Sequence, residues 1–230
     1  MVNRLKVRSG KKHGATSIAV IGLGRFGSAL ALELVKTGRE VLGIDGDDKL
    51  VQNMANALTH VVKADATDEN ALRELGIPEF DSAVVAIGTD LEASILTASL
   101  LLQLGVPEVW AKATSVSHGK ILLQLGVHHV IFPEMDMGKR VAHMVSGESL
   151  DYIQLADDFV MAKTEVPESF DGKILSDLKL RSKHGITVVA TTKPEGKYTP
   201  SSPETILNTG DVMIVAGETD KVEDFCRLGW

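Results

Sequence analysis

Short apolar runs alternate with longer amphipathic stretches over the first 133 residues of the chain. The first run, Ser17–Ile21, ends at Gly22, and the stretch that follows has apolar residues at the spacing of a helix that packs on a sheet. We predict strands at 17–21, 40–45, 59–63, 82–87, 108–112 and 129–132, with helices near 26–37, 47–55 and 69–75. Strands that alternate with helices in this order predict a doubly wound parallel sheet.

Three leucine-rich segments end in the same way. The sequences LRELGI, LLQLGV and LLQLGV each close with Leu-Gly and a branched apolar residue, at Gly76, Gly105 and Gly126. Glycine adopts the left-handed conformation that ends a helix without steric penalty. We therefore expect each of these segments to be the end of a helix that leads into the next strand.

The pattern changes after Phe132. A helix is predicted from Pro133 to about Met144, and Ser146-Gly147 follows it. Beyond it, the pattern predicts strands at 152–155, 159–165, 186–190 and 212–215, a helix at 174–180 and a turn-rich segment at 193–203. This second part is expected to be a small α+β domain rich in strands. We divide the chain into a tail (1–14), a first domain that includes the helix after Phe132 (15–147) and a C-terminal domain (148–230).

Charge is unevenly distributed along the chain. The formal net charge is −7, and the first fourteen residues contribute +5 because they hold five Lys and Arg and no acid, which leaves −12 for the remainder. The remainder of the chain, with that negative charge, does not attract nucleic acid. The basic segment 1–14 is expected to be a flexible, solvated tail, although it could also contact an anionic surface.

Sequence features also indicate the compartment. The single cysteine, Cys226, excludes an internal disulfide and is typical of a reducing compartment. No apolar segment follows the basic tail as in a signal peptide, and no apolar run is long enough to cross a bilayer. We expect a cytoplasmic protein.

A glycine-rich loop joins the first strand to the first helix. In Gly22-Leu-Gly-Arg-Phe-Gly27, Gly22 permits a tight turn, Gly24 lets the backbone approach a phosphate, and Gly27 lets the helix pack closely on the strand. The N-terminus of the helix then offers N–H groups and a partial positive charge to the anion. We expect a Rossmann-type domain that binds an adenine nucleotide at this loop.

Polar residues that follow the next strands are candidates to contact the nucleoside part of the nucleotide. Asp45 ends the second strand, where a carboxylate accepts hydrogen bonds from the ribose hydroxyls and repels a 2′-phosphate, so NADP is excluded. Asp45 could instead be a turn residue. Asp65-Ala66-Thr67 follows the third strand beside the expected adenine, although Asp65 or Thr67 could equally cap the next helix. Thr89 is interpreted first as the N-cap of a capping box with Glu92 and second as a residue that contacts the ligand.

Three charged residues are expected to lie near the phosphates of the nucleotide. Arg25 lies inside the glycine loop, and Lys112 ends the fifth strand, where its ammonium would complement phosphates unless it is a solvated surface lysine. Glu134 follows the sixth strand at the same edge. A carboxylate beside phosphates is repulsive unless a divalent cation such as Mg²⁺ or Ca²⁺ bridges them, so Glu134 is a candidate metal ligand.

Together these motifs resemble those of the RCK (KTN) regulators of potassium transport, most closely the single-cassette KtrA/TrkA-type subunits. The resemblance rests on IGLGRFG at 21–27, Asp45, ADAT at 64–67, AIG at 86–88, WAK at 110–112 and PEMDMG at 133–138, and it covers nearly the whole chain. It implies a homo-octameric ring, built from dimers, beneath a membrane potassium channel or transporter of the KtrB/TrkH type. It also implies that ATP and ADP compete for one site.

The resemblance further implies roles for individual residues. Arg25 would contact the terminal phosphates, Asp45 the ribose, Asp65 and Ala66 the adenine edge, and Glu134 a neighbouring subunit's nucleotide through a divalent cation. Phe26, Thr67, Gly88 and Lys112 would complete the nucleotide site. The helix at 133–144 would be the crossover helix that joins paired subunits.

The C-terminal domain of several KtrA-like proteins binds cyclic di-AMP at a dimer interface. Ile174, Asp177, Arg181 and Ile186 stand where such a pocket would draw its residues, and Arg181 could equally be a surface cation after a helix.

Two other functions share the glycine loop. An NAD-dependent oxidoreductase would need a positioned acid or base, and the candidates His118, His128 and His129 have no evident carboxylate partner in the sequence. The other alternative is a subunit that senses NAD(H) without catalysis. We therefore expect a regulatory subunit rather than an enzyme.

Overall fold

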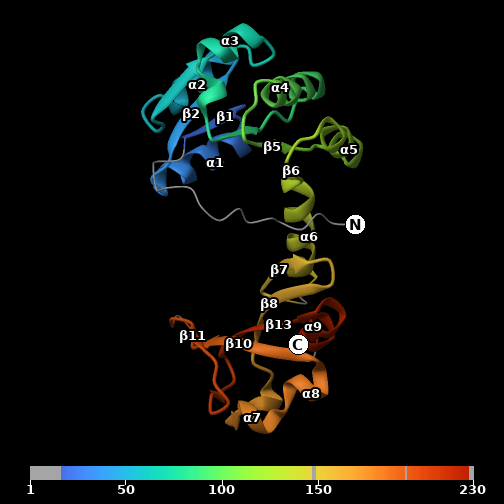
Figure 1. The fold of residues 1–230 in the computed structure, drawn as a ribbon. Helices are drawn as coiled ribbons and strands as arrows, with labels where there is room; N and C mark the ends of the chain where they lie inside the picture. Colours follow the sequence, from blue (N-terminus) through green and yellow to red (C-terminus); the bar gives the residue numbers. More distant parts are fainter. Residues whose placement is uncertain (1–16, 147–148, 195, 228–230) are drawn as a thin grey trace. The chain divides into compact units, whose positions relative to one another are not determined.

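The computed structural model describes residues 17–146, 149–194 and 196–227, which divide into two compact units between Pro133 and Glu134 (Figure 1). The predicted tail, 1–14, and the predicted domain boundary near Gly147 lie outside the described residues.

In the described part of the first unit, all strands form one six-stranded parallel sheet of order β3-β2-β1-β4-β5-β6. The strands are β1 (Ser17–Ile21), β2 (Glu40–Asp45), β3 (His60–Lys63), β4 (Ser82–Val85), β5 (Glu108–Lys112) and β6 (His129–Ile131). The order reverses between β1 and β4, where a doubly wound sheet opens its ligand crevice. The predicted Rossmann-type sheet is confirmed.

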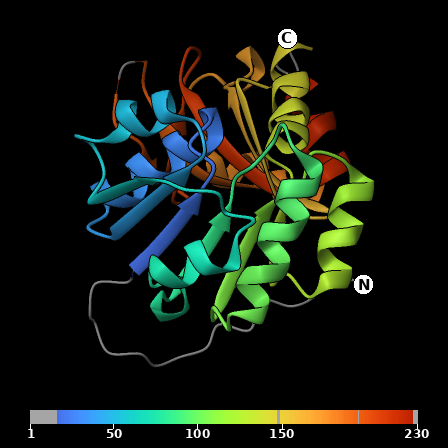
Figure 2. The same ribbon diagram turned by 90° about the horizontal axis from the view of Figure 1, so that it is seen from above.

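Helices cover both faces of this sheet. One apolar cluster joins β1 and β2 to α1 (Arg25–Lys36) and α2 (Asp48–Met54), through residues such as Val20, Ala31 and Met54. A second cluster, with Leu72, Leu101 and Leu122, joins the sheet to α3 (Glu69–Glu74), α4 (Leu91–Gln103) and α5 (Val116–Leu125). The short helix η1 (Ile77–Glu79) precedes β4. Figure 2 shows α4 and α5, in green, side by side.

Glycines end the three leucine-rich segments as predicted. Gly76, Gly105 and Gly126 have φ of +70°, +78° and +95°, values that side-chain-bearing residues rarely adopt. The caps at the other helix ends differ from the prediction. Asp90, not Thr89, caps α4 and accepts a hydrogen bond from the backbone N–H of Ala93 at 2.9 Å. Asp68 caps α3, so neither Asp65 nor Thr67 does.

The second unit begins at Glu134 and includes α6 (Pro133–Val145) after its first residue, whereas this helix was predicted to belong to the first domain. Side-chain contacts join the helix to the second unit. The guanidinium of Arg140 donates two hydrogen bonds of 2.7 Å to the carboxylate of Asp151, and the ring of His143 stacks on that of Tyr152 with centroids 3.8 Å apart. These contacts fasten α6 to the first strand of the second unit.

A five-stranded antiparallel sheet of order β11-β10-β13-β8-β7 forms the centre of the described second unit. Its strands are β7 (Asp151–Ala156), β8 (Phe159–Glu165), β10 (Ile186–Thr192), β11 (Thr199–Pro200) and β13 (Val212–Glu218), and β9 (Lys173–Ile174) pairs separately with β12 (Ile206–Leu207). The core contains Val160, Ile186, Met213 and Phe225. The predicted β-rich α+β fold is confirmed.

Several elements of this unit differ from the prediction. The helix predicted at 174–180 is two short helices, α7 (Leu175–Leu178) and α8 (Leu180–His184), because Lys179 between them has a left-handed φ of +50°. Ile174 belongs to β9. The short strands β9, β11 and β12, the turn η2 (Glu168–Phe170) and the helix α9 (Thr219–Cys226) were not predicted.

Candidate nucleotide-binding site

The glycine loop follows β1 at the carboxyl edge of the parallel sheet. Gly22 has a φ of +95°, and its N–H donates to the carbonyl of Ile44 at 2.8 Å. A Cβ on Gly22 would lie 3.0 Å from backbone atoms of Ala86 and Ile87, and a Cβ on Gly27 would overlap the carbonyl oxygen of Gly22. Glycine is therefore required at both positions by the packing of the loop itself.

Gly24 is different, since a Cβ there would meet no protein atom within 4 Å. It is the N-cap of α1, it makes no side-chain cap, and the first turn of α1 contains no acidic residue. The backbone N–H groups at this end keep their partial positive charge without a carboxylate of their own helix. The loop thus presents an open surface suited to an anion.

Asp45, at the end of β2, holds this loop by a hydrogen bond. Its Oδ2 accepts from the backbone N–H of Leu23 at 2.6 Å, and its Oδ1 accepts from the N–H of Asp47 at 2.8 Å. The alternative of a turn residue is therefore correct in part. Each carboxylate oxygen can accept more than one hydrogen bond, so both remain able to accept from a ribose hydroxyl.

The segment after β3 forms a self-bonded turn beside Asp45. The carbonyl of Asp45 accepts from the N–H of Ala64 at 3.1 Å. Asp65 Oδ1 accepts from the backbone N–H and hydroxyl of Thr67, at 2.9 and 2.7 Å, and these hydrogen bonds lower the pKa of Asp65, the hydroxyl contributing most. The buried hydroxyl of Thr97 donates to the carbonyl of Ala66 at 3.2 Å. Thr97 was not recognised in the sequence, where its only signal is a polar residue within an apolar helix.

Lys112 lies at the same edge and is only 8% exposed, so the alternative of a solvated surface lysine is wrong. Its Nζ lies 5.7 Å from the centroid of the Phe26 ring, a distance typical of a cation–π contact. A Cβ on Gly88 would come within 3.0 Å of the same Nζ. The structure therefore brings Lys112, Phe26 and Gly88 together beside the glycine loop, while Arg25 is exposed at the first residue of α1.

Glu134 lies in the first turn of α6, in the second unit, and its side chain is exposed. Within the ranges that the structure describes, no three His, Cys, Asp or Glu side chains gather as a metal-binding group. The bridging cation predicted at Glu134 would need phosphate oxygens as further ligands, and it stays a prediction.

The three histidines considered for catalysis are held by other contacts. Nδ1 of His118 accepts from the N–H of Thr114 at 3.3 Å, and burial lowers the pKa of this histidine. Nδ1 of His128 accepts from the N–H of Val109 at 2.9 Å. His129 has a carboxylate partner after all, because its Nε2 lies 3.0 Å from Glu108. Glu108 begins β5, however, at the opposite edge of the sheet from the glycine loop.

The residues proposed for cyclic di-AMP are only partly accessible. Ile174 is exposed on β9, and the exposed Arg181 donates from Nε and Nη2 to the hydroxyl of Thr187 at 3.2 and 3.1 Å. Asp177 lies exposed on α7. Ile186 is fully buried in the core, so its predicted contact with a ligand is wrong.

Comparison with known families gives two matches. The TrkA-N domain family matches residues 18–133, and the TrkA-C domain family matches residues 161–228. No helix among the described residues combines the length and apolar character needed to cross a membrane.

Individual relatives cover nearly the whole chain. Ktr system potassium uptake protein A of Bacillus subtilis (strain 168) is 38% identical over 92% of this chain and 96% of its own length. Protein C of the same system and organism is 39% identical over 90% of this chain and 94% of its own length. The corresponding protein A of Vibrio alginolyticus is 35% identical over 92% of this chain and 96% of its own length.

Among solved structures, the GsuK RCK domain shares the fold with a TM-score of 0.65 and 16% identity. The match covers 95% of this chain but only 48% of the GsuK chain. The GsuK channel bound to NAD also has a TM-score of 0.65 at 16% identity, over 92% of this chain and 39% of that one.

Proposed function

The chain belongs to the TrkA-N/TrkA-C family that includes the Ktr system potassium uptake proteins, and on this premise we propose that it is a regulatory subunit of potassium transport controlled by adenine nucleotides. One observation carries the nucleotide part of the proposal. The open N-terminus of α1, Asp45 and the buried Lys112 lie together at the carboxyl edge of the sheet.

Each part of a nucleotide has a partner at this edge. Backbone N–H groups of the loop, Arg25 and Lys112 bind the phosphates, and Asp45 accepts from the ribose. Asp65, Ala66 and Thr67 border the adenine, and Phe26 and Gly88 keep Lys112 in place. Because two cations serve the phosphates, we favour ATP and ADP as the ligands, with Glu134 bridging to them through Mg²⁺ or Ca²⁺.

Assembly and partner follow from the family. In this proposal the subunits form dimers and then an octameric ring on the cytoplasmic face of the membrane, where the ring gates a potassium channel subunit of the KtrB/TrkH type. Cyclic di-AMP is the proposed ligand of the C-terminal dimer, at Ile174, Asp177 and Arg181. A ligand shifts the equilibrium between the two states of such a gate only if it binds those states with unequal affinity.

A second candidate is a subunit that senses NAD(H). Asp45 suits the ribose of NAD as well as that of ATP, and structures of the same fold are known with NAD and with ADP. An NAD-dependent oxidoreductase is less well supported. The His129–Glu108 pair lies at the opposite edge of the sheet from the glycine loop, and a second pair, His143 with Glu223 at 3.9 Å, belongs to the second unit.

The experiment is calorimetric titration of ATP, ADP and NADH into the wild type and Gly24→Asp at one salt concentration, with assays for NADH oxidation and ATP hydrolysis. A carboxylate at residue 24 places negative charge where the phosphates are expected, and the space there is open, so binding should be lost while the fold is kept. Steady turnover of NADH or ATP that Gly24→Asp abolishes would refute the regulatory proposal. Tighter binding of NADH than of ATP would favour the second candidate.

A further inference from the structure

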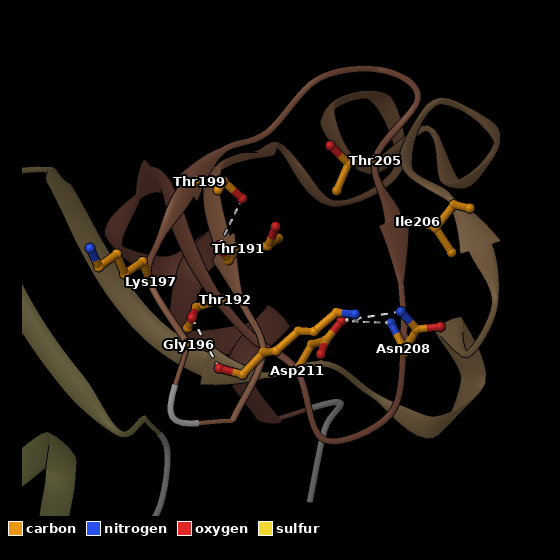
Figure 3. Close-up of a pocket in the computed structure, with 10 residues that line it drawn as sticks. Thr191, Thr192, Gly196, Lys197, Thr199, Thr205, Ile206, Asn208 and Asp211 are labelled. Atoms are coloured by element: carbon orange, nitrogen blue, oxygen red, sulfur yellow. Dashed lines mark hydrogen bonds between the residues drawn. The ribbon is translucent and has the colours of Figure 1, made fainter.

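The described part of the second unit contains a cavity of about 380 Å³ between β10, β11 and the segment that leads into β13 (Figure 3). This volume is within the range of small-molecule sites, about 300–1,000 Å³. Four threonines contribute to the lining: Thr191, Thr192, Thr199 and Thr205. None of the residues assigned above to the nucleotide or to cyclic di-AMP lines it.

Two polar side chains at the cavity are buried. Asp211 is 8% exposed and Thr191 is 9% exposed. Oδ2 of Asp211 accepts from the backbone N–H and the side-chain amide of Asn208, both at 3.3 Å, and these bonds do not use Oδ1. A carboxylate in such a place is stabilised by hydrogen-bond donors. A hydroxyl group of a ligand could donate to Oδ1.

Figure 3 shows how the polar groups are arranged. Asp211 and Asn208 lie on one side, and Thr199 and Thr191 lie across the open space, with the hydroxyl of Thr199 donating to the carbonyl of Thr191 at 3.4 Å. The hydroxyl of Thr205 accepts from the N–H of Ser202 at 2.8 Å and keeps its own proton to donate. Donors and acceptors are therefore available around one space.

Two lysines lie at the mouth of the cavity. Lys193 and Lys197 both line it and are exposed, and Asp211 is the carboxylate among the described residues of the lining. Figure 3 shows the side chain of Lys197 directed outward from the rim. A lysine has a flexible four-carbon stem, so its ammonium can turn to an anion bound at the mouth.

We propose that this cavity binds a phosphorylated sugar. The sugar hydroxyls contact Asp211, Asn208 and Thr191, and the phosphate lies at the mouth, where Lys193 and Lys197 neutralise it. No aromatic side chain is among the described residues that line the cavity, so nothing there would stack on a base. The geometry favours a free sugar phosphate over the same group within a nucleotide.

The test is calorimetric titration of ribose 5-phosphate into the full-length protein with excess ATP, which removes competition at the glycine loop. Lys193→Gln combined with Lys197→Gln should weaken binding by about tenfold or more, since each lost charge-assisted bond is worth roughly 1.5–3 kcal/mol and 1.4 kcal/mol is tenfold. Lys183→Gln, which removes an exposed charge on α8 away from the cavity, is the matched control and should change nothing.

Two further measurements distinguish the contribution of the sugar to binding from that of the phosphate. Thr191→Val, of nearly equal volume, should weaken ribose 5-phosphate but leave any binding of inorganic phosphate unchanged. AMP should bind more weakly than ribose 5-phosphate. Absence of binding at millimolar ribose 5-phosphate, or binding that the double lysine variant leaves intact, overturns the proposal. Tighter binding of AMP overturns the preference for a free sugar. Circular dichroism melts confirm that each variant is folded.

Discussion

At the scale of the residue, glycines of one loop have different physical roles. Gly22 and Gly27 are required by protein packing, whereas Gly24 faces open space. The sequence motif assigns the tight turn to Gly22 and the close packing to Gly27 correctly, because the spacing of the glycines reflects the geometry of a strand–loop–helix unit. The approach of a phosphate at Gly24 stays a prediction. The burial of Lys112 could not be predicted, because it depends on Phe26 and Gly88, which are far from Lys112 in the sequence.

We expect Gly27→Ala to destabilise the protein and Gly24→Ala to leave its stability nearly unchanged. The methyl group at residue 27 would overlap the carbonyl of Gly22, and forced overpacking costs about 1–3 kcal/mol. Urea unfolding of both variants measures the difference. Equal stability of Gly27→Ala and the wild type would show that the loop can move away from the helix.

Arg25→Gln should weaken ATP binding about tenfold or more and ADP binding less. The reason is that one charge-assisted hydrogen bond to the terminal phosphate is worth about 1.5–3 kcal/mol, and ADP lacks that phosphate. Arg39→Gln removes the same charge beyond the other end of α1 and is the control. Calorimetric titration of ATP, ADP and NADH provides the measurement. Equal weakening of all three would mean that Arg25 only raises the local positive potential.

At the scale of the element, the strands and helices of the first unit could be predicted because apolar periodicity and glycine caps agree there. The second unit was harder. Its helix at 174–180 is divided at Lys179, a residue type that seldom has positive φ, and strands of two residues such as β9 and β12 give no periodicity. The contact between α6 and β7 through Arg140 and Asp151 joins residues eleven positions apart in the chain, and the apolar pattern does not reveal it.

We expect Arg140→Gln to lower stability at pH 7 and to reduce its dependence on acid. The hydrogen bonds from Arg140 lower the pKa of Asp151 below its ordinary value, so the contribution is present above about pH 4 and is lost as pH falls through the lowered pKa. Urea midpoints at pH 7 and pH 3 should therefore lie closer together in the variant. An unchanged difference between the two midpoints would show that the pair contributes nothing measurable.

At the scale of the whole molecule, the chain consists of a unit with a Rossmann-type sheet and a C-terminal unit, and two domain families match residues 18–133 and 161–228 separately. A regulatory subunit must convert ligand identity into a change that a membrane partner detects. Glu134, the second residue of α6 and the first residue of the second unit, is the residue through which we expect one subunit to contact the nucleotide of its neighbour.

Glu134→Gln should weaken the dependence of ATP binding on Mg²⁺ or Ca²⁺, because a neutral amide no longer needs a cation between itself and the phosphates. Asp136→Asn, an exposed acid in the same helical turn, is the control. Titrations of ATP with and without each cation provide the measurement. If both variants keep the wild-type cation dependence, Glu134 is only an acid that favours the helix N-terminus.

The 2.6 Å bond from the N–H of Leu23 to Asp45 has a consequence for kinetics. Asp45 fixes the loop through hydrogen bonds within the protein, so we expect the loop to be ordered before a nucleotide arrives and little chain entropy to be lost on binding. Association should then be fast and nearly the same for related nucleotides, and their affinities should differ mainly in dissociation rates. The residence time of the departing nucleotide, rather than loop ordering, would set how quickly the subunit follows a change in the nucleotide pool.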